Sequence, residues 1–338
     1  MRAIPVIGLT GYLGAGKTTL LNHVLRSPGA RIGVIINDFG ELNVDAMLVT
    51  GQIDEPASIA GGCICCLSDD DGIDDALARF TDPRLELDAV IIEASGVAEP
   101  AGVARMIGFS DVKGVRFGGL VDVIDAATHF DTVDVGPTPP ARYAAASLIV
   151  VNKLDRLPET ERAAMVDRVK DRVQQRGSRA AVIGAMDGNI DPELLYDVAV
   201  PRDQLGQLSL RELFVDVDSA HAHHSAHADS VTVTSTGLVD PGALLDLLEN
   251  PPDGVYRLKG VVAVRYGAAT PTYLVNVVAD AVHVEAAPPG AVANCLVAIG
   301  AHLDDDDVRA RLEAALRPAT GSPTVATVHR LRRYRRRT

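Results

Sequence analysis

The sequence predicts an α/β protein with a doubly wound, mostly parallel sheet, followed by a smaller α+β domain. Three observations support this prediction. The 338 residues are 47% hydrophobic but only 4% aromatic, and such aliphatic chains are typical of parallel sheets covered by helices. Along the first part of the chain, apolar stretches of strand length alternate with helical patterns. Near residue 208 this alternation gives way to short strands of period two, which indicates a second domain.

The first domain is expected to span residues 1–208. Its predicted helices lie at "KTTLLNHVLR", at "GIDDALARF" and over 158–177, where Gly177 ends an amphipathic pattern. Its predicted strands are buried and apolar: 4–10, 32–37, 87–96, "GGLVDVID" and "ASLIVVNKLD". Because parallel sheets bind ligands at the carboxyl ends of their strands, functional residues are expected in the loops that follow these strands.

The rest of the chain divides into a linker, a second domain and a tail. The linker is expected at 209–229 and holds the polar stretch "DSAHAHHSAHADS". The strands "SVTVTS", "GVVAVRYG", "TYLVNVV" and "AVHVEA", flanked by helical patterns, predict an α+β domain at 230–320. The last segment, 321–338, contains the basic run "RLRRYRRRT", which we interpret as a solvated end, with a contact arm as the alternative.

Bulk properties limit the partners and the compartment. The formal net charge of −13 disfavours a nucleic-acid partner. The chain has no apolar run long enough to span a bilayer and no signal-peptide pattern at its start, so we expect a cytoplasmic protein without a membrane partner. Four cysteines in such a chain do not make a disulfide framework, and the thiols are expected to be reduced.

The segment "GYLGAGKT", residues 11–18, fits the pattern G-x4-G-K-T and lies between a predicted strand and a predicted helix. Its glycines let backbone amides surround phosphates, and the helix N-terminus adds partial positive charge. Lys17 is expected to reach the β- and γ-phosphates, and the Thr18 hydroxyl to bind Mg²⁺. The predicted nucleotide-binding residues of this loop are Gly11, Gly14, Ala15, Gly16, Lys17, Thr18 and Thr19.

A second motif, "NKLD" at 152–155, predicts which base is bound. The carboxylate of Asp155 can accept both hydrogen-bond donors on the edge of guanine, and adenine does not offer this pair. Lys153 would lie across the ring, and Asn152 would brace the loop. The motif therefore favours GTP over ATP, and it opposes the alternative of an ATP-using kinase.

Acidic residues between these two motifs complete the predicted site. Glu93 ends a predicted strand where it would hold Mg²⁺, often through water, with a helix-capping carboxylate as the alternative. The backbone N–H of Gly96 is placed to meet the γ-phosphate. The segment "NDFGELNVD" suits a switch that orients water or binds a metal, and its carboxylates, among which the sequence does not choose, are Asp38, Glu41 and Asp45. The predicted catalytic set is Lys17, Asp38 and Glu93.

Three of the four cysteines, Cys63, Cys65 and Cys66, lie in "GGCICC". Thiolates at this spacing suit Zn²⁺ or another soft divalent ion, with further ligands from other segments. The C-x-x-C spacing of Cys63 and Cys66 also suits a redox pair, and structural cysteines are a third alternative. The residues alone leave these alternatives open. The fourth cysteine, Cys295, lies in an apolar strand and is expected in the core.

In this order, "TGYLGAGKTTLLN", "INDFGELNVD", "GGCICC", "EASGVAEP" and "NKLD" resemble the CobW family of GTPases, metallochaperones related to the nickel-insertion GTPases of urease and hydrogenase. The segments "YRLKGVVAV" and "CLVAIGAHLDDDDVRARL" resemble the C-terminal domain of the same family. The resemblance therefore covers nearly the whole chain.

The resemblance implies a P-loop GTPase that acts as a metallochaperone. Cys65 and Cys66, together with Cys63, would bind a transferred Zn²⁺ or Co²⁺ ion beside the nucleotide, and Glu41 is the expected oxygen ligand. Intrinsic hydrolysis of GTP is expected to be slow, since no arginine finger is evident. An apo-metalloprotein client would receive the metal, and a homodimer is among the expected assemblies. The alternative is a nucleotide-gated metal buffer or stress regulator that acts by contact with a partner.

The sequence departs from the family pattern at two positions and shortens a third feature. Some relatives carry a metal-binding Glu where this chain has Ile36, which cannot coordinate an ion. The acidic residue usual before the "IVVNK" strand is replaced by Ser147, which is expected to alter only local packing. The His-rich stretch of many relatives is reduced here to His221, His223, His224 and His227. These would hold Zn²⁺ weakly and load the thiol site, or they are incidental residues of a solvated linker.

Overall fold

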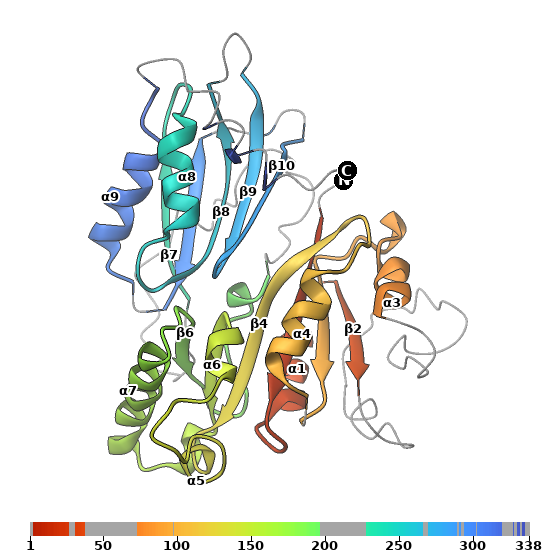
Figure 1. The fold of residues 1–338 in the computed structure, drawn as a ribbon, viewed down its shortest axis with the longest axis vertical. Coiled ribbons are helices and arrows are strands. Elements are labelled where there is room, and N and C mark those ends of the chain that lie inside the picture. The colour runs from red at the N-terminus through yellow and green to blue at the C-terminus, as the bar shows by residue number, and fades with distance from the viewer. Residues whose placement is uncertain are drawn as a thin grey trace. The chain divides into compact units, whose positions relative to one another are not determined.

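The structure is a computed structural model. It describes residues 3–26, 31–37, 73–96, 98–196, 228–265, 270–288, 294–301 and 303–319, with single positions at 291, 327, 330, 331, 333 and 334. These residues form two compact units (Figure 1). The first unit contains the elements from β1 to η3, and the second contains those from β7 to α9.

The first unit alternates strands and helices. Its strands are β1 (Ile4–Gly11), β2 (Ile32–Asn37), β3 (Ala89–Ala94), β4 (Val115–Asp125), β5 (Leu148–Asn152) and β6 (Ala181–Gly184). Its helices are α1 (Lys17–Leu25), α3 (Ile73–Phe80), α4 (Pro100–Gly108), α5 (His129–Thr132), α6 (Arg142–Ala145) and α7 (Glu159–Gln175). Short 3-10 turns lie at η1 (Pro83–Leu85), η2 (Leu154–Arg156) and η3 (Pro192–Leu194).

The strands of the first unit form a sheet with the order β2-β3-β1-β4-β5-β6. Every pairing in it is parallel, which confirms the predicted doubly wound sheet. The chain turns to opposite sides of β1 to build the β3 and β4 neighbours, so the loop after β1 lies at the switch point where such sheets bind ligands. The motif at 11–18 therefore occupies the expected place in the fold.

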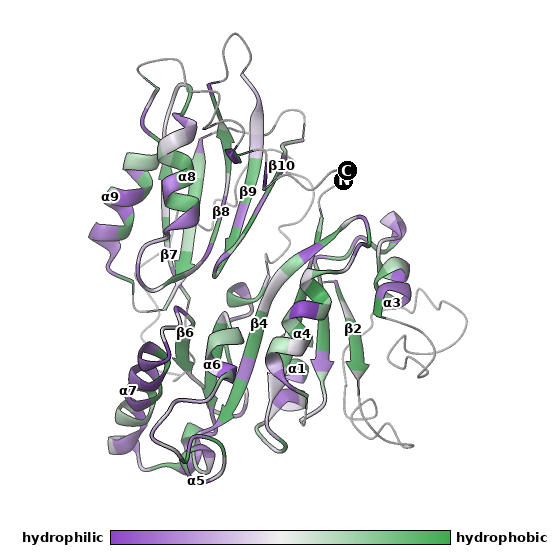
Figure 2. Cartoon of the chain, in the orientation of Figure 1, coloured by the Kyte–Doolittle hydropathy of each residue, from purple (hydrophilic) through white to green (hydrophobic). Residues whose placement is uncertain are grey.

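Apolar packing holds the helices on this sheet. Residues of α3 and α4, including Leu77, Phe80 and Ile107, pack with buried residues of β1 to β4. The helix α7 matches its prediction closely, because it runs from Glu159 to Gln175 and ends where Gly177 adopts a left-handed conformation. Figure 2 shows the polar character of α7, whose buried side contributes Val166, Val169 and Val173. Among the described residues, no helix combines the length and apolar content needed to cross a membrane.

The second unit is an antiparallel sheet with two helices. Its elements are β7 (Asp229–Thr234), α8 (Pro241–Glu249), β8 (Val255–Ala263), β9 (Thr272–Val278), β10 (Ala281–Ala286), β11 (Cys295–Gly300) and α9 (Asp305–Ala315). The strand order is β10-β9-β8-β11-β7, and all its pairings are antiparallel. The predicted α+β fold of this region is therefore confirmed, and Cys295 is buried on β11 as expected.

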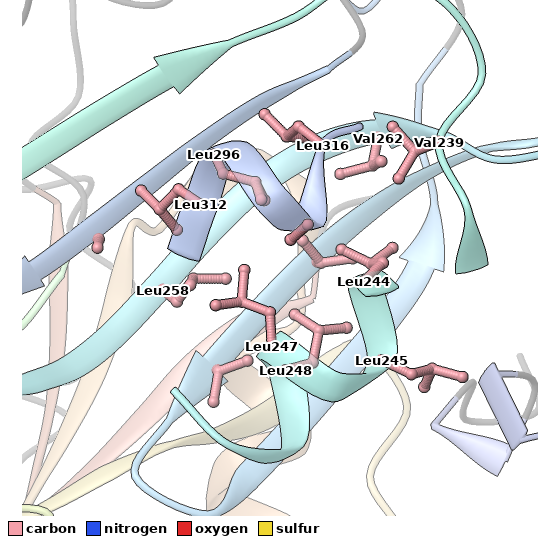
Figure 3. Packing of buried hydrophobic residues seen from close by; sticks show 14 of the residues in the cluster. Val239, Leu244, Leu245, Leu247, Leu248, Leu258, Val262, Leu296, Leu312 and Leu316 are labelled. Carbon is pink, nitrogen blue, oxygen red and sulfur yellow. The ribbon is translucent and has the colours of Figure 1, made fainter. Parts of the chain in front are cut away.

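Aliphatic side chains between the helices and the sheet form the core of the second unit. Figure 3 shows Leu244, Leu247 and Leu248 of α8 close to Leu258 and Leu296 of the sheet. The helix α8 begins where the side chain of Asp240 accepts a hydrogen bond from the N–H of Gly242 at 2.7 Å, a stabilising N-cap. The core is therefore built from residues that the alternating strand pattern and two amphipathic helices supply.

The basic tail differs from the solvated end that its sequence predicts. Leu331 is buried in the core of the second unit. The hydroxyl of Tyr334 donates a hydrogen bond to Glu249 Oε1 at 2.9 Å, and Arg330 forms an ion pair with the same carboxylate. The apolar residue of the run anchors it, so the described part of the tail belongs to the second unit.

Candidate nucleotide site

The loop between β1 and α1 is shaped by its glycines. Gly14 and Gly16 have φ angles of 76° and 100°, in the left-handed region that L-residues rarely adopt. The N–H of Ala15 closes a turn by donating to the carbonyl of Tyr12 at 3.1 Å. A side chain at Gly16 would also collide with the amide of Asn152. Both the conformation and the close approach therefore require glycine at position 16.

Lys17, Thr18 and Glu93 meet where this loop enters α1. Lys17 is buried, and its ammonium donates to the carbonyl of Gly11 at 3.1 Å. The Thr18 hydroxyl donates to Glu93 Oε1 at 2.9 Å, because Glu93 on β3 lies beside Leu9 of β1 in the sheet register. The N-terminus of α1 has no side-chain cap, so the structure does not use Glu93 in the alternative role of helix cap for α1. An ammonium, a hydroxyl and a carboxylate are thus gathered at the start of one helix.

Gly96 follows β3 and approaches the loop at 11–18, the predicted phosphate-binding loop. A Cβ atom at this position would lie 2.9 Å from both the nitrogen and the Cα of Leu13. Contacts this short do not occur between real side chains and backbone, so any larger residue would push the two loops apart. The predicted γ-phosphate contact at Gly96 therefore lies directly against the loop that would hold the phosphates.

Asn152, the last residue of β5, joins three segments of the site. Its Nδ2 donates to the carbonyl of Ala15 at 3.1 Å, and its Oδ1 accepts from the N–H of Gly188 at 2.9 Å. The side chain is fully buried, so both contacts are made away from water, where hydrogen bonds are costly to lose. The loop after β5 is thereby fixed to the phosphate-binding loop.

Lys153 and Asp155 project differently from the same loop. Lys153 has a φ angle of 62°, and its ammonium donates both to the carbonyl of Gly14 and to Asp125 Oδ2, the latter at 2.7 Å. Leu154 is buried and anchors the turn, since its N–H donates to the carbonyl of Ala185 at 3.1 Å. Asp155 is exposed. Recognition of the guanine edge needs an accessible carboxylate, and this turn presents the carboxylate of Asp155.

Two residues at this site were missed by the sequence predictions. Gly188 has a φ angle of 68°, and a Cβ atom there would lie 2.6 Å from the nitrogen of Leu20 on α1. Its sequence signal is the "DG" pair after a strand, a common turn marker. Asp125 ends β4 and forms the ion pair with Lys153. No local pattern identifies this pair, because it depends on the register between β4 and β5.

A buried polar network lies beside the phosphate-binding loop. Asp122 on β4 accepts from the Thr10 hydroxyl at 3.0 Å and from Arg142 of α6 at 2.6 and 2.7 Å. A small cleft next to this network has Tyr12, Leu13, Asp125, Thr128, His129 and Arg142 among its lining residues. The guanidinium of Arg142, at the wall of the cleft, is thus paired with the buried carboxylate of Asp122.

The network continues through His129 and Tyr143. His129 Nε2 lies 2.6 Å from the Tyr143 hydroxyl, which donates to Asp134 Oδ2 at 3.1 Å. Burial lowers the pKa of His129 to about 4, against attraction from Asp122 and Asp134. Burial also raises the pKa of Tyr143. The pKa of Asp134 is lowered although its burial opposes ionisation, because Arg172 and Tyr143 donate hydrogen bonds to it. At neutral pH the histidine and tyrosine are therefore uncharged between ionised partners.

The two departures from the family pattern have plain structural accounts. Ile36 is buried in β2, among the apolar residues of the first unit. The Ser147 hydroxyl accepts from the N–H of Leu120 at 2.8 Å and donates to its carbonyl at 3.0 Å. Ser147 therefore makes local contacts with β4.

The predicted metal ligands lie outside the described residues: Glu41, Cys63, Cys65, Cys66, His221, His223, His224 and His227, and so does the predicted catalytic Asp38. In the part of the chain that the structure describes, no group of three or more His, Cys, Asp or Glu side chains could hold a metal ion. The thiol site therefore stays a prediction from sequence.

Two sequence families match this chain. Residues 5–183 match the family described as "CobW/HypB/UreG, nucleotide-binding domain". Residues 228–316 match the family described as "Cobalamin synthesis protein cobW C-terminal domain". The first match covers more than half of the chain, and the second falls on the antiparallel sheet unit.

Individual proteins are also similar to this chain. The zinc chaperone CobW of Sinorhizobium sp is 31% identical over 293 residues, which cover 77% of this chain and 78% of that protein. The zinc chaperone YjiA of Escherichia coli is 31% identical over 204 residues, which cover 58% of this chain and 62% of that protein. The crystal structure of the Zn(II)-bound YjiA GTPase from E. coli covers 93% of this chain and 99% of its own, with 24% identity and a TM-score of 0.43.

Proposed function

The chain belongs to the CobW/HypB/UreG family of nucleotide-binding proteins, and from this premise we propose that it is a GTP-dependent metal chaperone. It binds and slowly hydrolyses GTP, and the state of the nucleotide controls the binding and release of a divalent transition-metal ion. Zn²⁺ is the proposed cargo, because similar proteins are named as zinc chaperones, with Co²⁺ as the alternative ion. An apo-metalloprotein is the proposed recipient.

One observation carries the nucleotide part of this proposal. Asn152 and Lys153, at the start of "NKLD", donate hydrogen bonds to the carbonyls of Ala15 and Gly14 in the phosphate-binding loop. A ligand with both a guanine base and a phosphate chain would engage two loops that are already joined. Preorganisation of this kind lowers the entropy cost of binding and favours a nucleoside triphosphate over either part alone.

The proposed chemistry uses residues at the start of α1. Lys17 and the amides at the helix N-terminus would stabilise negative charge on the β- and γ-phosphates. Thr18 Oγ1 and Glu93 Oε1, 2.9 Å apart, are hard oxygen donors of the kind Mg²⁺ prefers. Mg²⁺ bound there with GTP would neutralise charge on the β- and γ-oxygens. Asp38 is proposed to orient the attacking water.

The metal part of the proposal rests on the order of segments along the chain. Cys63, Cys65 and Cys66 lie between the switch segment "NDFGELNVD" and β3, whose end carries Glu93 and leads to Gly96. Segments that contact the γ-phosphate change their order when it is lost. Thiolates on such segments would bind the cargo tightly with GTP and release it after hydrolysis. By thermodynamic linkage, the metal must then tighten GTP binding in return.

The test measures competition for Zn²⁺ with a chromophoric chelator in the presence of Mg·GTP or Mg·GDP. Wild type should bind Zn²⁺ more tightly with GTP, and the Cys65→Ala/Cys66→Ala variant should lose that difference. Cys295→Ala is the matched control, since it removes a thiol from the second unit. Unchanged affinity in the double variant would reassign the metal to the linker histidines and contradict the thiol site.

Metal transfer separates chaperone action from simple buffering. A competing apo-protein is added to the zinc-loaded wild type with GTP or with a non-hydrolysable analogue. Transfer should be faster with GTP, and the rate of GTP hydrolysis should change when stoichiometric Zn²⁺ is present. Equal transfer with both nucleotides would contradict release driven by hydrolysis and support a nucleotide-gated buffer.

A further inference from the structure

Asp125 is the residue of the described site for which neither the phosphate-binding loop nor "NKLD" supplies a role. It ends β4, and in the sheet register it lies beside Asn152, which ends β5. Its Oδ1 accepts the N–H of Ala127 at 3.0 Å, and its Oδ2 lies 2.7 Å from the ammonium of Lys153. The two oxygens therefore do different things: one closes the turn after β4, and the other faces the neighbouring loop.

Lys153 is held by two partners, one at the end of a strand and one in a loop. Its ammonium donates to Asp125 on β4 and to the carbonyl of Gly14 after β1. The exposed fractions of the two charged side chains are 18% for Lys153 and 15% for Asp125, so water screens the pair only in part. A free lysine side chain has many rotamers. The carboxylate of Asp125 restricts those rotamers and keeps the ammonium against the phosphate-binding loop.

We propose that Asp125 is a positioning residue for the guanine nucleotide, acting through Lys153. It fixes the lysine that would lie across the base, and through Gly14 it ties that lysine to the loop that would hold the phosphates. Asp125 itself need not touch the nucleotide. This inference rests on the proposed GTP binding and adds a residue that the "NKLD" motif does not contain.

Asp125→Asn isolates the interaction with Lys153. An asparagine side chain keeps an oxygen to accept the N–H of Ala127, so the turn after β4 is retained. Its remaining group is an uncharged NH₂, which cannot accept from the ammonium of Lys153. Asp131→Asn is the matched control, because it removes the same charge from an exposed residue of α5, close in sequence to Asp125.

The experiment is a double-mutant cycle on the full-length protein, read by equilibrium binding of GDP and GTP. Asp125→Asn and Lys153→Ala should each weaken binding about tenfold, as expected for loss of a charge-assisted hydrogen bond. The double variant should bind no more weakly than Lys153→Ala, since Asp125 acts through the lysine. At saturating GTP the hydrolysis rate of Asp125→Asn should stay within about twofold of wild type, with the loss appearing in KM. Asp131→Asn should bind like wild type.

The outcomes separate this inference from the function on which it rests. Wild type that binds GTP no better than ATP would overturn the proposed function, and this inference with it. Wild type that prefers GTP, with Asp125→Asn binding as tightly, would overturn the inference alone. Additive losses in the double variant would also overturn it, because they would show that Asp125 acts independently of Lys153. A thermal unfolding scan of each apo variant tests whether it is folded, and Asp125→Asn should unfold within about 3 °C of wild type.

Discussion

The two units of this protein differ in how many charged side chains their described residues bury. The first unit buries Lys17, Glu93, Asp122 and Asn152 toward the carboxyl edge of its sheet, and each of them has a hydrogen-bond partner from another segment. The core of the second unit, between its helices and its sheet, is built almost wholly from Val and Leu, although this unit also buries Arg257, Asn276 and Asn294. Burying charge is costly unless it is paired, and the first unit pairs its buried charges near the edge of the sheet where parallel strands bind ligands. The contrast supports the placement of the proposed nucleotide site in the first unit.

Breaking a buried ion pair should produce the largest change. Arg142→Ala leaves the carboxylate of Asp122, which is fully buried, with the Thr10 hydroxyl as its described side-chain partner. Removing one partner of such a pair should lower the free energy of unfolding of the first unit by about 4 kcal/mol. The chain has no Trp, so calorimetry or far-UV circular dichroism is the suitable measurement.

A matched arginine variant provides the control for Arg142→Ala. Arg168 lies over the ring of Phe130 at 3.5 Å on the exposed side of α7. Its replacement by Ala removes the same charge and should cost less than about 1 kcal/mol. Equal losses in the two variants would show that the Asp122 pair is not specially important to the first unit.

Shortening a buried apolar side chain in the second unit should lower stability by less than Arg142→Ala does. It should leave the affinity for GTP unchanged. Leu258 is fully buried on β8 beneath the helices, and Leu258→Ala should cost about 3 kcal/mol in the unfolding of that unit. GTP affinity, measured at a temperature where both units are folded, should equal that of wild type. A drop in GTP affinity would contradict the division of roles between the units.

The stability of the first unit should depend on pH through the buried residue His129. Burial lowers the pKa of His129 from 6.5 to about 4, so the unfolded chain takes up this proton at a higher pH than the folded chain does. The stability contributed by neutral His129 is complete above pH 6.5 and is lost as pH falls toward 4. At pH 5 the first unit should therefore be less stable than at pH 8 by about 2 kcal/mol from this residue alone.

His129→Phe tests that dependence, because it keeps an aromatic ring and removes the titrating group. Its unfolding free energy should fall less between pH 8 and pH 5 than that of wild type. The charged groups facing His129 are Asp122, Asp134, Arg142 and Arg168, and all of them are retained in the variant. An identical pH dependence in both proteins would assign the acid sensitivity to other groups.

Sequence patterns predicted the backbone of the site better than its side-chain partners. The strand ends, the loop at 11–18 and the turn at "NKLD" follow from local signals, namely an apolar run, a glycine pattern and a helix start. Local signals do not predict the contacts of Asp125 with Lys153 and of Asp122 with Arg142. The first contact depends on the register between β4 and β5, and the second depends on where α6 packs against β4. The tail was predicted to be solvated because arginines surround Leu331 in the sequence. The local pattern did not show that this one apolar residue packs in the core of the second unit.

The smallest expected effect concerns a residue where the sequence departs from its family. Ser147→Ala removes a hydroxyl that contacts both the N–H and the carbonyl of Leu120, and it should lower the stability of the first unit by about 1 kcal/mol. GTP affinity should not change, because these contacts lie at the beginning of β5, whereas Asn152 ends that strand and Lys153 follows it. Comparing the stability and GTP affinity of Ser147→Ala with those of Arg142→Ala tests whether every buried polar contact of the first unit supports the nucleotide site. A loss of GTP affinity in Ser147→Ala would extend the functional network to the start of the strand, whereas a loss of stability alone would confine it to the loops at the carboxyl edge of the sheet.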